Sequence, residues 1–277
     1  MKINTNTSSM FATRQLGDAY KSFSDSINRL STGKRINKAA DDASGMTIAN
    51  RLNSQAAGMG QAIKNANDAI SVTQIADGAL EEAANLINTI KTKSIQASSD
   101  SQSHESRAAI QSDINNALKS LDRISQTTSF NGQKLLSGAF TDKQFQVGAN
   151  SNETVEISIG SSDSAHLGSE EKGSLSTIDV TTFEGAQKAI EIADAALEQV
   201  NTIRSSIGSK QNQLASTINN LSNSQINSYA AESAIRDIDL AEESMNMSRL
   251  ETLTKARTFA AAQANASHKN VMALFGT

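Results

Sequence analysis

Proline, cysteine and tryptophan are all absent from this chain of 277 residues, and aromatic residues make up only 4% of it. The lack of cysteine excludes disulfides and thiolate metal sites, and it leaves the redox compartment open. The lack of proline leaves long helices unbroken and removes slow cis/trans isomerisation from folding, although coiled coils in general avoid proline too. A core of alanine, isoleucine and leucine is expected, which favours close-packed helices over a bulky globular interior.

The chain also lacks an excess of positive charge and long apolar runs, which disfavours nucleic acids and membranes as partners. The formal net charge of −4 argues against a nucleic-acid partner, which would require a dense basic face. No run approaches the roughly 20 consecutive apolar residues that span a bilayer, so no membrane insertion is expected. The start of the chain, MKINTNTSSM, lacks the apolar region of a cleavable secretory signal, so none is expected.

The longest pattern in the sequence covers residues 44–97, where apolar residues recur at alternating steps of three and four. This spacing is the coiled-coil period and predicts a helix roughly 75 Å long, with Ser44 as its N-cap. Such a helix is too long to be covered by a compact domain, so its partners must also be long. The first part of the seam consists of Ala49, Leu52, Ala56, Met59, Ile63, Ala66, Ile70 and Thr73.

Helical spacing appears again after a polar turn at residues 98–103, from Ile110 to Ile124, and this helix is expected to fold back on the first. It returns near Thr182 and continues to Leu221, which predicts a second long helix antiparallel to the first. Between them, Asn131-Gly132 predicts a hairpin turn.

A second hairpin is expected around residues 149–152, because alternating apolar residues flank that segment. The stretch from 160 to 176 is rich in serine, glycine and glutamate, and we expect it to be an exposed, mobile loop.

Short amphipathic segments occupy both ends of the chain. Residues 1–15 are polar and not obviously helical, whereas a helix is expected from Leu16 to a C-cap at Gly33. Two such helices cannot bury their apolar stripes in a pair alone, so we expect frayed ends in the monomer and ordered ends in an assembly. The predicted assembly interface consists of Leu16, Tyr20, Phe23, Ile27, Leu30, Met245, Leu250, Leu253, Phe259, Leu274 and Phe275.

The sequence contains no recognisable catalytic, cofactor-binding or metal-binding constellation. None of the three histidines has a second ligand at metal spacing. Adjacent carboxylates such as Glu81 and Glu82 do not face each other on a helix, so a solvated face explains them. Gly58 and Gly60 lie inside the long helix, where close approach of another backbone is a better explanation than a dinucleotide loop.

The expected fold is mainly α: a long antiparallel coiled-coil helical bundle with a small β-hairpin region and with paired N- and C-termini. Residues 1–43 and 236–277 would form an inner terminal helix pair. Residues 44–129 and 177–235 would form a long-helix domain, to which the hairpin and exposed loop of residues 130–176 belong.

The chain resembles bacterial flagellin, the subunit of the flagellar filament. The match follows the family's order over essentially the whole chain. The motifs that carry it are INTN at 3–6, LSTGKRINKAADDASGM at 30–46, SFNG at 129–132 with Leu135-Leu136, FQVGAN at 145–150, INNL at 218–221 and AQAN at 262–265.

The resemblance implies a role for each part of the chain. The terminal helix pair would line the filament channel, and the long-helix domain would form the wall. The large outer domains of longer flagellins have only residues 160–176 in their place. The implied partners are further copies of the chain, the flagellar export apparatus with a chaperone, the filament cap and the hook–filament junction proteins, and the implied location is extracellular.

Two alternatives stay open at this point. A hook–filament junction protein is built on a similar helical plan, but would be scarce in sheared filaments. A soluble helical adaptor would stay monomeric or dimeric at high salt, where flagellin polymerises onto seeds.

One segment departs from many flagellins. Residues 87–96 match a segment of the form Leu-Gln-Arg-x-Arg-Glu-Leu-x-x-Gln, which the host's flagellin-sensing Toll-like receptor reads, but the first arginine is Thr89 and the second leucine is Lys93. The chain therefore resembles the flagellins that escape that receptor. The altered recognition segment comprises Thr89, Lys91, Lys93, Ile95 and Gln96, with an acidic residue retained as Asp113.

Two modifications are also expected from the resemblance. Serines of the expected loop are candidate O-glycosylation sites, namely Ser161, Ser162, Ser164 and Ser169. The large Lys2 side chain disfavours removal of the initiator, so Met1 would be retained.

Overall fold

A computed structural model describes residues 5–169 and 173–275, and the side chains up to residue 267. The chain divides into two compact units. The terminal unit contains residues 1–55 and 227–277, and the central unit contains residues 56–226. These limits fall inside two long helices, whereas the division predicted at residues 43 and 236 falls at helix ends.

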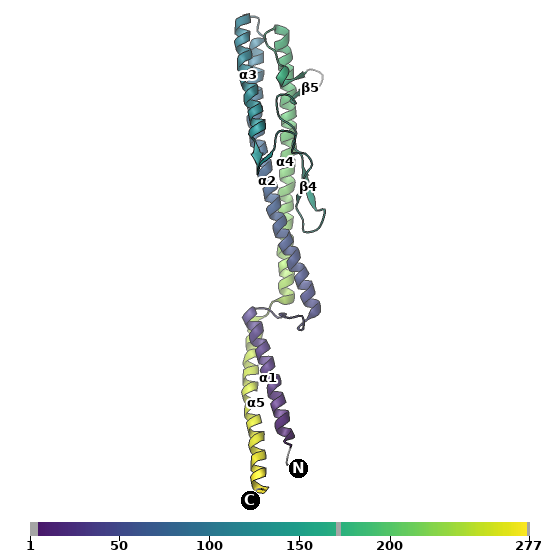
Figure 1. Cartoon of the computed structure of the whole chain (residues 1–277), viewed down its shortest axis with the longest axis vertical. Coiled ribbons are helices and arrows are strands. Elements are labelled where there is room, and N and C mark those ends of the chain that lie inside the picture. The colour runs from purple at the N-terminus through teal and green to yellow at the C-terminus, as the bar shows by residue number, and fades with distance from the viewer. Residues whose placement is uncertain (1–4, 170–172, 276–277) are drawn as a thin grey trace. The chain divides into compact units, whose positions relative to one another are not determined.

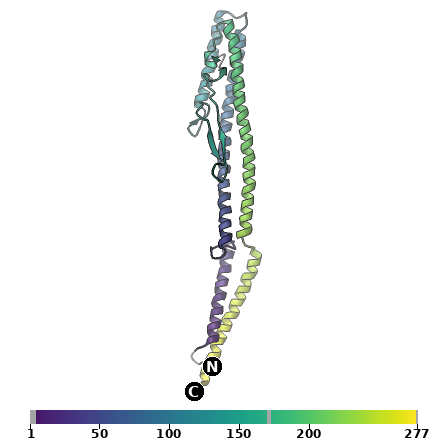
Figure 2. The same ribbon diagram turned by 90° about the vertical axis from the view of Figure 1, so that its right-hand side faces the viewer.

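The terminal unit is built around two antiparallel helices, α1 (Thr7–Thr32) and α5 (Leu240–Phe275), which lie side by side in both ribbon views (Figures 1 and 2). The helix α1 begins nine residues before Leu16, so the prediction that residues 7–15 are not helical was wrong. Its start is fixed by Asn6, whose side chain accepts a hydrogen bond from the Ser9 amide at 2.9 Å. Its end at Gly33 is confirmed, since that residue adopts the left-handed conformation with φ 67°.

A short antiparallel bridge joins the two segments that follow α1 and precede α5. Lys34 pairs with Asp237. The Arg35 amide donates to the Arg236 carbonyl at 2.7 Å, and the Ile238 amide donates to the Gly33 carbonyl at 3.2 Å. These backbone contacts hold the two chain segments together at one end of the helix pair.

The helix α2 (Ala43–Ala97) is capped by Asp42, and not by Ser44 as predicted. The Gly45 amide donates to the Asp42 carboxylate at 2.9 Å. The neighbouring Asp41 accepts from the backbone amides of Lys38 and Asn37, which lowers the pKa of its carboxyl group. Two adjacent aspartates thus organise the turn that leads into the long helix.

The central unit packs α2 against α3 (His104–Thr127) and α4 (Phe183–Arg236), which run beside it (Figures 1 and 2). This arrangement confirms the predicted mainly α fold. The short turn before α3 is closed by Ser103, whose hydroxyl accepts from the Ser106 amide at 3.2 Å. The seam predicted for α2 is buried in part, since Ala49, Ala56, Met59, Ala66 and Thr73 are buried whereas Leu52, Ile63 and Ile70 are half-buried. Fully buried side chains include Leu80, Ile87 and Ile90 of α2, Ile114 and Leu121 of α3, and Val200, Ile207 and Leu214 of α4.

Pairs of short antiparallel strands cover part of this bundle. The first pair is β1 (Ser129–Phe130) with β2 (Gln133–Lys134), which confirms the hairpin turn predicted at Asn131-Gly132, and both turn residues have positive φ. The second is β3 (Lys143–Gln146) with β4 (Thr154–Ile157), which confirms the second hairpin. The third is β5 (Gly168–Ser169) with β6 (Gly173–Ser174), followed by a 3₁₀ turn, η1 (Leu175–Thr177).

The second hairpin explains a glycine of α2. A Cβ added at Gly58 would lie 3.2 Å from the Cβ of Ala149 in that hairpin. The prediction that another backbone approaches this part of α2 closely is therefore confirmed for Gly58.

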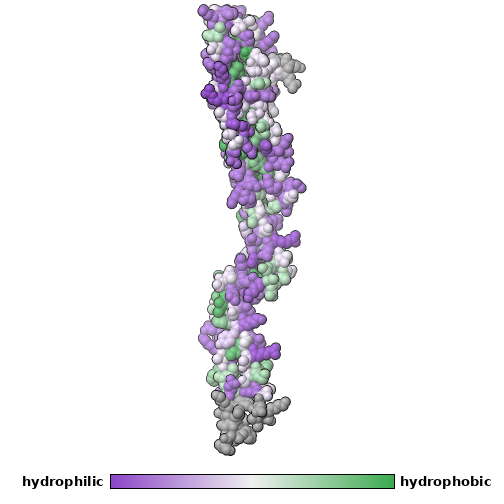
Figure 3. Space-filling model, viewed as in Figure 1, coloured by the Kyte–Doolittle hydropathy of each residue, from purple (hydrophilic) through white to green (hydrophobic). Residues whose placement is uncertain are grey.

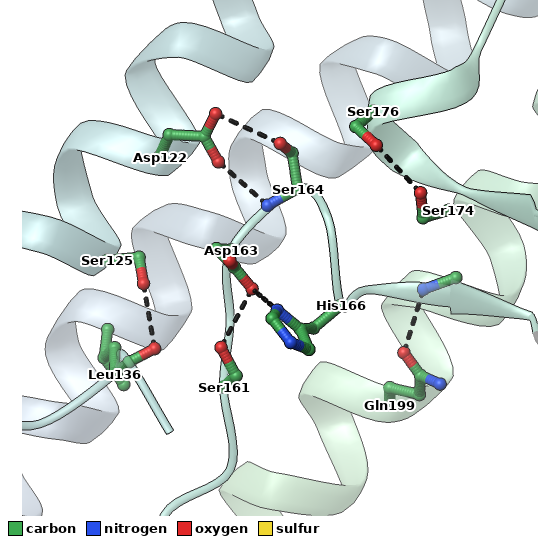
Figure 4. Close-up of polar contacts among 11 residues, drawn as sticks. Asp122, Ser125, Leu136, Ser161, Asp163, Ser164, His166, Ser174, Ser176 and Gln199 are labelled. Atoms are coloured by element: carbon green, nitrogen blue, oxygen red, sulfur yellow. Dashed lines mark hydrogen bonds and ion pairs between the residues drawn. The ribbon is translucent and has the colours of Figure 1, made fainter. Parts of the chain in front are cut away.

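The prediction of an exposed, mobile loop over residues 160–176 was wrong for the described part of that stretch. Leu167 and Leu175 are buried, and they contribute to the core. Asp122 of α3 accepts hydrogen bonds from both the backbone amide and the hydroxyl of Ser164, at 2.8 and 3.0 Å (Figure 4). The Gly168 amide likewise donates to the Gln199 side chain of α4 at 3.0 Å, so this serine-rich stretch packs against the bundle although its composition is that of an exposed loop.

Candidate assembly interface

The seam between α1 and α5 is made of small and polar side chains. Its buried residues are Ala19 and Ser26 of α1, with Glu243, Thr254 and Ala261 of α5. The large apolar side chains of α1 had been predicted to belong to an assembly interface, because a helix pair alone cannot bury them. The close approach of the two helices uses the small residues of the seam, and the larger apolar ones flank the contact.

Polar contacts cross this seam at separate positions along the two helices. The Ser26 hydroxyl donates to the Glu243 carboxylate. Farther along, Arg257 donates to the Gln15 carbonyl at 2.8 Å. Near the ends, the Asn6 amide nitrogen donates to the Ala264 carbonyl at 3.2 Å.

Most of the predicted interface side chains remain accessible in the single chain. Tyr20 is 53% exposed, Met245 68% and Phe259 74%. Ile27 and Leu253 are also exposed, whereas Leu16, Phe23, Leu30 and Leu250 are half-buried. The side chains of Leu274 and Phe275 lie outside the described residues. Figure 3 shows hydrophobic residues, in green, on the surface of this helix pair.

Sequence reasoning missed other exposed apolar side chains of the same unit. Met10 and Phe11 are each 66% exposed on α1, and Leu240 is 60% exposed at the start of α5. The first two were missed because residues 1–15 were expected not to be helical. The capping signal of Asn6, followed by Ser9, would have extended the helix to include them. The exposed apolar surface of the pair therefore reaches farther along α1 than predicted.

In the part of the chain that the structure describes, no grouping of side chains indicates a catalytic site. Among those residues, no three histidines, aspartates or glutamates are grouped so that they could hold a metal ion. Nor does any helix within residues 5–169 and 173–275 have the length and apolar content needed to cross a membrane.

Comparison with known proteins identifies the family. The model of the bacterial flagellin N-terminal helical region matches residues 3–141, and that of the bacterial flagellin C-terminal helical region matches residues 190–275. A flagellin of Halalkalibacterium halodurans is 36% identical over 274 residues, which cover 99% of each chain. The chain belongs to the bacterial flagellin family. The family consists of structural proteins, not of enzymes.

Other flagellins differ in length. Flagellin A of Helicobacter pylori is 44% identical over 252 residues, which cover 90% of this chain and 49% of that protein. The chain thus spans about half the length of the Helicobacter flagellins that it matches. Polar flagellin A of Vibrio parahaemolyticus is 31% identical over the whole of both chains. The solved structure of Bacillus cereus flagellin is 21% identical, with a TM-score of 0.49, and covers 57% of this chain and 88% of that one.

The altered recognition segment lies on α2 of this flagellin, and two of its lysines form ion pairs with the neighbouring helices. Lys93 is 2.7 Å from the Asp113 carboxylate of α3, and Lys91 is 2.5 Å from the Asp194 carboxylate of α4. The Thr89 hydroxyl donates to the Asn85 carbonyl of its own helix at 3.0 Å. The remaining members, Ile95 and Gln96, are exposed.

The candidate glycosylation serines differ in accessibility. Ser162 and Ser164 are buried, at 1% and 6% exposed, which disfavours both as acceptors in the folded chain. Ser161 and Ser169 are half-buried. The Ser161 hydroxyl donates to Asp163 at 2.8 Å, and His166 contacts the same carboxylate at 2.6 Å (Figure 4).

Proposed function

We propose that this flagellin is a structural subunit that polymerises into the bacterial flagellar filament for swimming. Family membership supports this role, and one structural observation carries it. Large apolar side chains on both α1 and α5, among them Tyr20, Met245 and Phe259, are exposed in the single chain. An apolar surface of this kind marks an interaction site, and further copies of the chain would cover it.

The physical mechanism follows from the shape of a two-helix pair. Each helix can bury only the side that faces its partner, so part of each apolar stripe stays in water until other subunits approach. Heterologous contacts between copies repeat as an open helix and do not close into a ring. In this proposal, residues 1–43 and 236–277 line the channel, residues 44–129 and 177–235 form the wall, and residues 130–176 belong to the wall.

Seeded polymerisation tests the proposal. Purified chain at high salt should extend filament seeds, and electron microscopy should show long filaments. Deletion of residues 1–30 should abolish extension while the central helices stay folded by circular dichroism. A soluble adaptor would remain monomeric or dimeric in this assay. A junction protein would be scarce in sheared filaments, where this chain should dominate.

We also infer an export route in which the chain travels unfolded through the growing flagellum and folds at its tip. Its partners would be the export apparatus, a chaperone, the filament cap and the hook–filament junction proteins, and its final location would be extracellular. A chain without proline or cysteine suits this route, because no isomerisation or disulfide step delays folding. Refolding by stopped-flow fluorescence or circular dichroism should show no phase of tens of seconds. Such a phase would oppose this part of the proposal.

We infer further that the host's flagellin-sensing receptor responds weakly to this chain. An arginine presents a planar fork of donors, which the hydroxyl of Thr89 cannot replace. In this chain the Thr89 hydroxyl already donates to a carbonyl of its own helix. The acidic Asp113 is also occupied by Lys93. Thus two groups that could bind the receptor are engaged within the chain.

A reporter assay with purified monomer tests this inference. The combined change Thr89→Arg and Lys93→Leu should raise the response, because it adds the donor fork and frees Asp113. Thr202→Arg is the matched control, since its hydroxyl is also bonded to its own helix, at 2.8 Å from the Glu198 carbonyl. A potent response from the unchanged chain would refute weak recognition.

Two modifications complete the proposal. Ser161 and Ser169 stay as candidate glycosylation sites, and Met1 is proposed to be retained. An intact mass equal to that of the unmodified sequence would confirm retention of Met1 and exclude glycosylation, whereas a mass lower by one methionine would contradict retention.

A further inference from the structure

The seam between α1 and α5 contains a carboxylate that is almost fully buried. Glu243 is 9% exposed and Ser26, which donates to it, is 2% exposed. Asn246, one turn along α5, reaches the same carboxylate oxygen at 3.4 Å. Burying a carboxylate is unfavourable unless hydrogen bonds satisfy it, so this position depends on a specific partner.

The other buried side chains of the seam discriminate poorly between alternative alignments of the two helices. These are Ala19, Thr254 and Ala261, which are too small to interlock. In helix pairs, a polar residue in the seam commonly specifies the register, at some loss of stability.

The other polar contacts across the seam do not define a register either. Both Arg257 and Asn6 donate to backbone carbonyls. Every residue has a carbonyl, so these contacts could form again after a slip. Ser9 and Asn265 do pair through their side chains, but this pair is exposed to water. Exposed polar contacts contribute little.

The sequence around Ser26 makes a slip unfavourable. Its neighbours on the same face of α1, one turn away, are Ser22 and Phe23 before it and Arg29 and Leu30 after it. A shift that places Phe23 or Leu30 opposite Glu243 would remove the donor that α1 supplies, while the carboxylate is still buried.

We infer that the Ser26–Glu243 pair is a positioning contact that sets the register of α1 against α5. One turn of slip moves the side chains of one helix by about 5 Å relative to those of the other. The pair would thereby fix the positions of the exposed Tyr20 and Ile27 of α1 along the helix pair relative to Met245 and Phe259 of α5. The importance of these positions for polymerisation rests on the proposed function, whereas the register itself does not.

Thiol crosslinking of the full-length chain tests the register, because the native sequence has no cysteine. The in-register reporter carries Ser9→Cys with Asn265→Cys, since those side chains meet. The slipped reporter carries Ser9→Cys with Ala262→Cys, three residues earlier on α5. A short bifunctional thiol reagent is applied to the soluble chain and, separately, to pelleted filaments. In the parent, the in-register product should exceed the slipped one by more than about tenfold, because a charge-assisted hydrogen bond is lost on slipping.

Four changes in the reporter background then isolate the pair. Ser26→Ala with Glu243→Leu makes the seam apolar, and the crosslink ratio should fall toward one while helix content is kept. Ser26→Ala alone should weaken the helix pair, because it removes the donor that α1 supplies to a buried carboxylate. Glu243→Gln keeps an acceptor for Ser26 and should retain the ratio. Glu242→Gln changes an exposed neighbour and should have no effect.

An unchanged ratio in the double variant would overturn the inference, as would a parent that crosslinks in both registers. Failure of filaments to form would instead contradict the proposed function, since the crosslink ratio of the soluble chain is measured independently.

Discussion

Truncation of Phe259 to alanine should weaken polymerisation while it leaves the stability of the single chain almost unchanged. This side chain is 74% exposed in the single chain. Full burial of a phenylalanine contributes roughly 1.5–3 kcal/mol, so about three-quarters of that, roughly 1–2 kcal/mol, is gained only when another copy covers it. Its loss should raise the critical concentration for polymerisation about 5- to 30-fold. The thermal unfolding of the soluble chain should change by less than about 1 kcal/mol.

The assay is sedimentation of polymer over a series of chain concentrations, with circular dichroism of the soluble chain alongside. Gln263→Ala is the matched control, because it shortens an exposed side chain one turn farther along α5. An unchanged critical concentration in the Phe259→Ala variant would refute the reasoning. So would a loss of about 3–5 kcal/mol in the soluble chain, which is the effect expected of a buried phenylalanine.

Three further predictions concern the single chain. Ile87→Ala, at a fully buried position of the central unit, should destabilise that unit by about 2–5 kcal/mol in chemical denaturation. Gly33→Ala should destabilise the end of α1 by roughly 1 kcal/mol in thermal unfolding, because φ there is 67°. The side chain and backbone of Asn150 donate to Glu153 and lower the pKa of its carboxyl group, so its stabilisation of the β3–β4 hairpin is present above pH 4.5 and is lost as the pH falls below that. Amide exchange of the hairpin against pH should show this loss, and Glu153→Gln should remove it.

The helical framework was predictable because its signals are local and long. A three-four repeat over residues 49–73 specifies a helix face, and five of its eight residues are buried, with Ala62, Ala69 and Val72 buried beside them. The Asn131-Gly132 turn and the Gly33 cap were likewise predictable, since both depend on backbone conformations with positive φ.

Two features were not predictable from such patterns. The stretch over residues 160–176 has the composition of a loop, but its packing depends on partners distant in sequence, such as Asp122 for Ser164. The small residues of the seam between α1 and α5 were not predicted, because the apolar pattern marks only large side chains, whereas close contact of two helices favours small ones such as Ala19. A hydrophobic pattern indicates which residues avoid water, and it does not tell whether a neighbouring helix or another subunit covers them.

The central claim is that other copies of the chain cover the exposed apolar side chains of the terminal unit. A reconstruction of polymerised full-length chain by electron cryomicroscopy tests this claim most directly. The account predicts filaments in which Tyr20, Ile27, Met245 and Phe259 are buried between subunits. Filaments in which these four side chains face water, or a chain that forms no filaments on seeds, would contradict it.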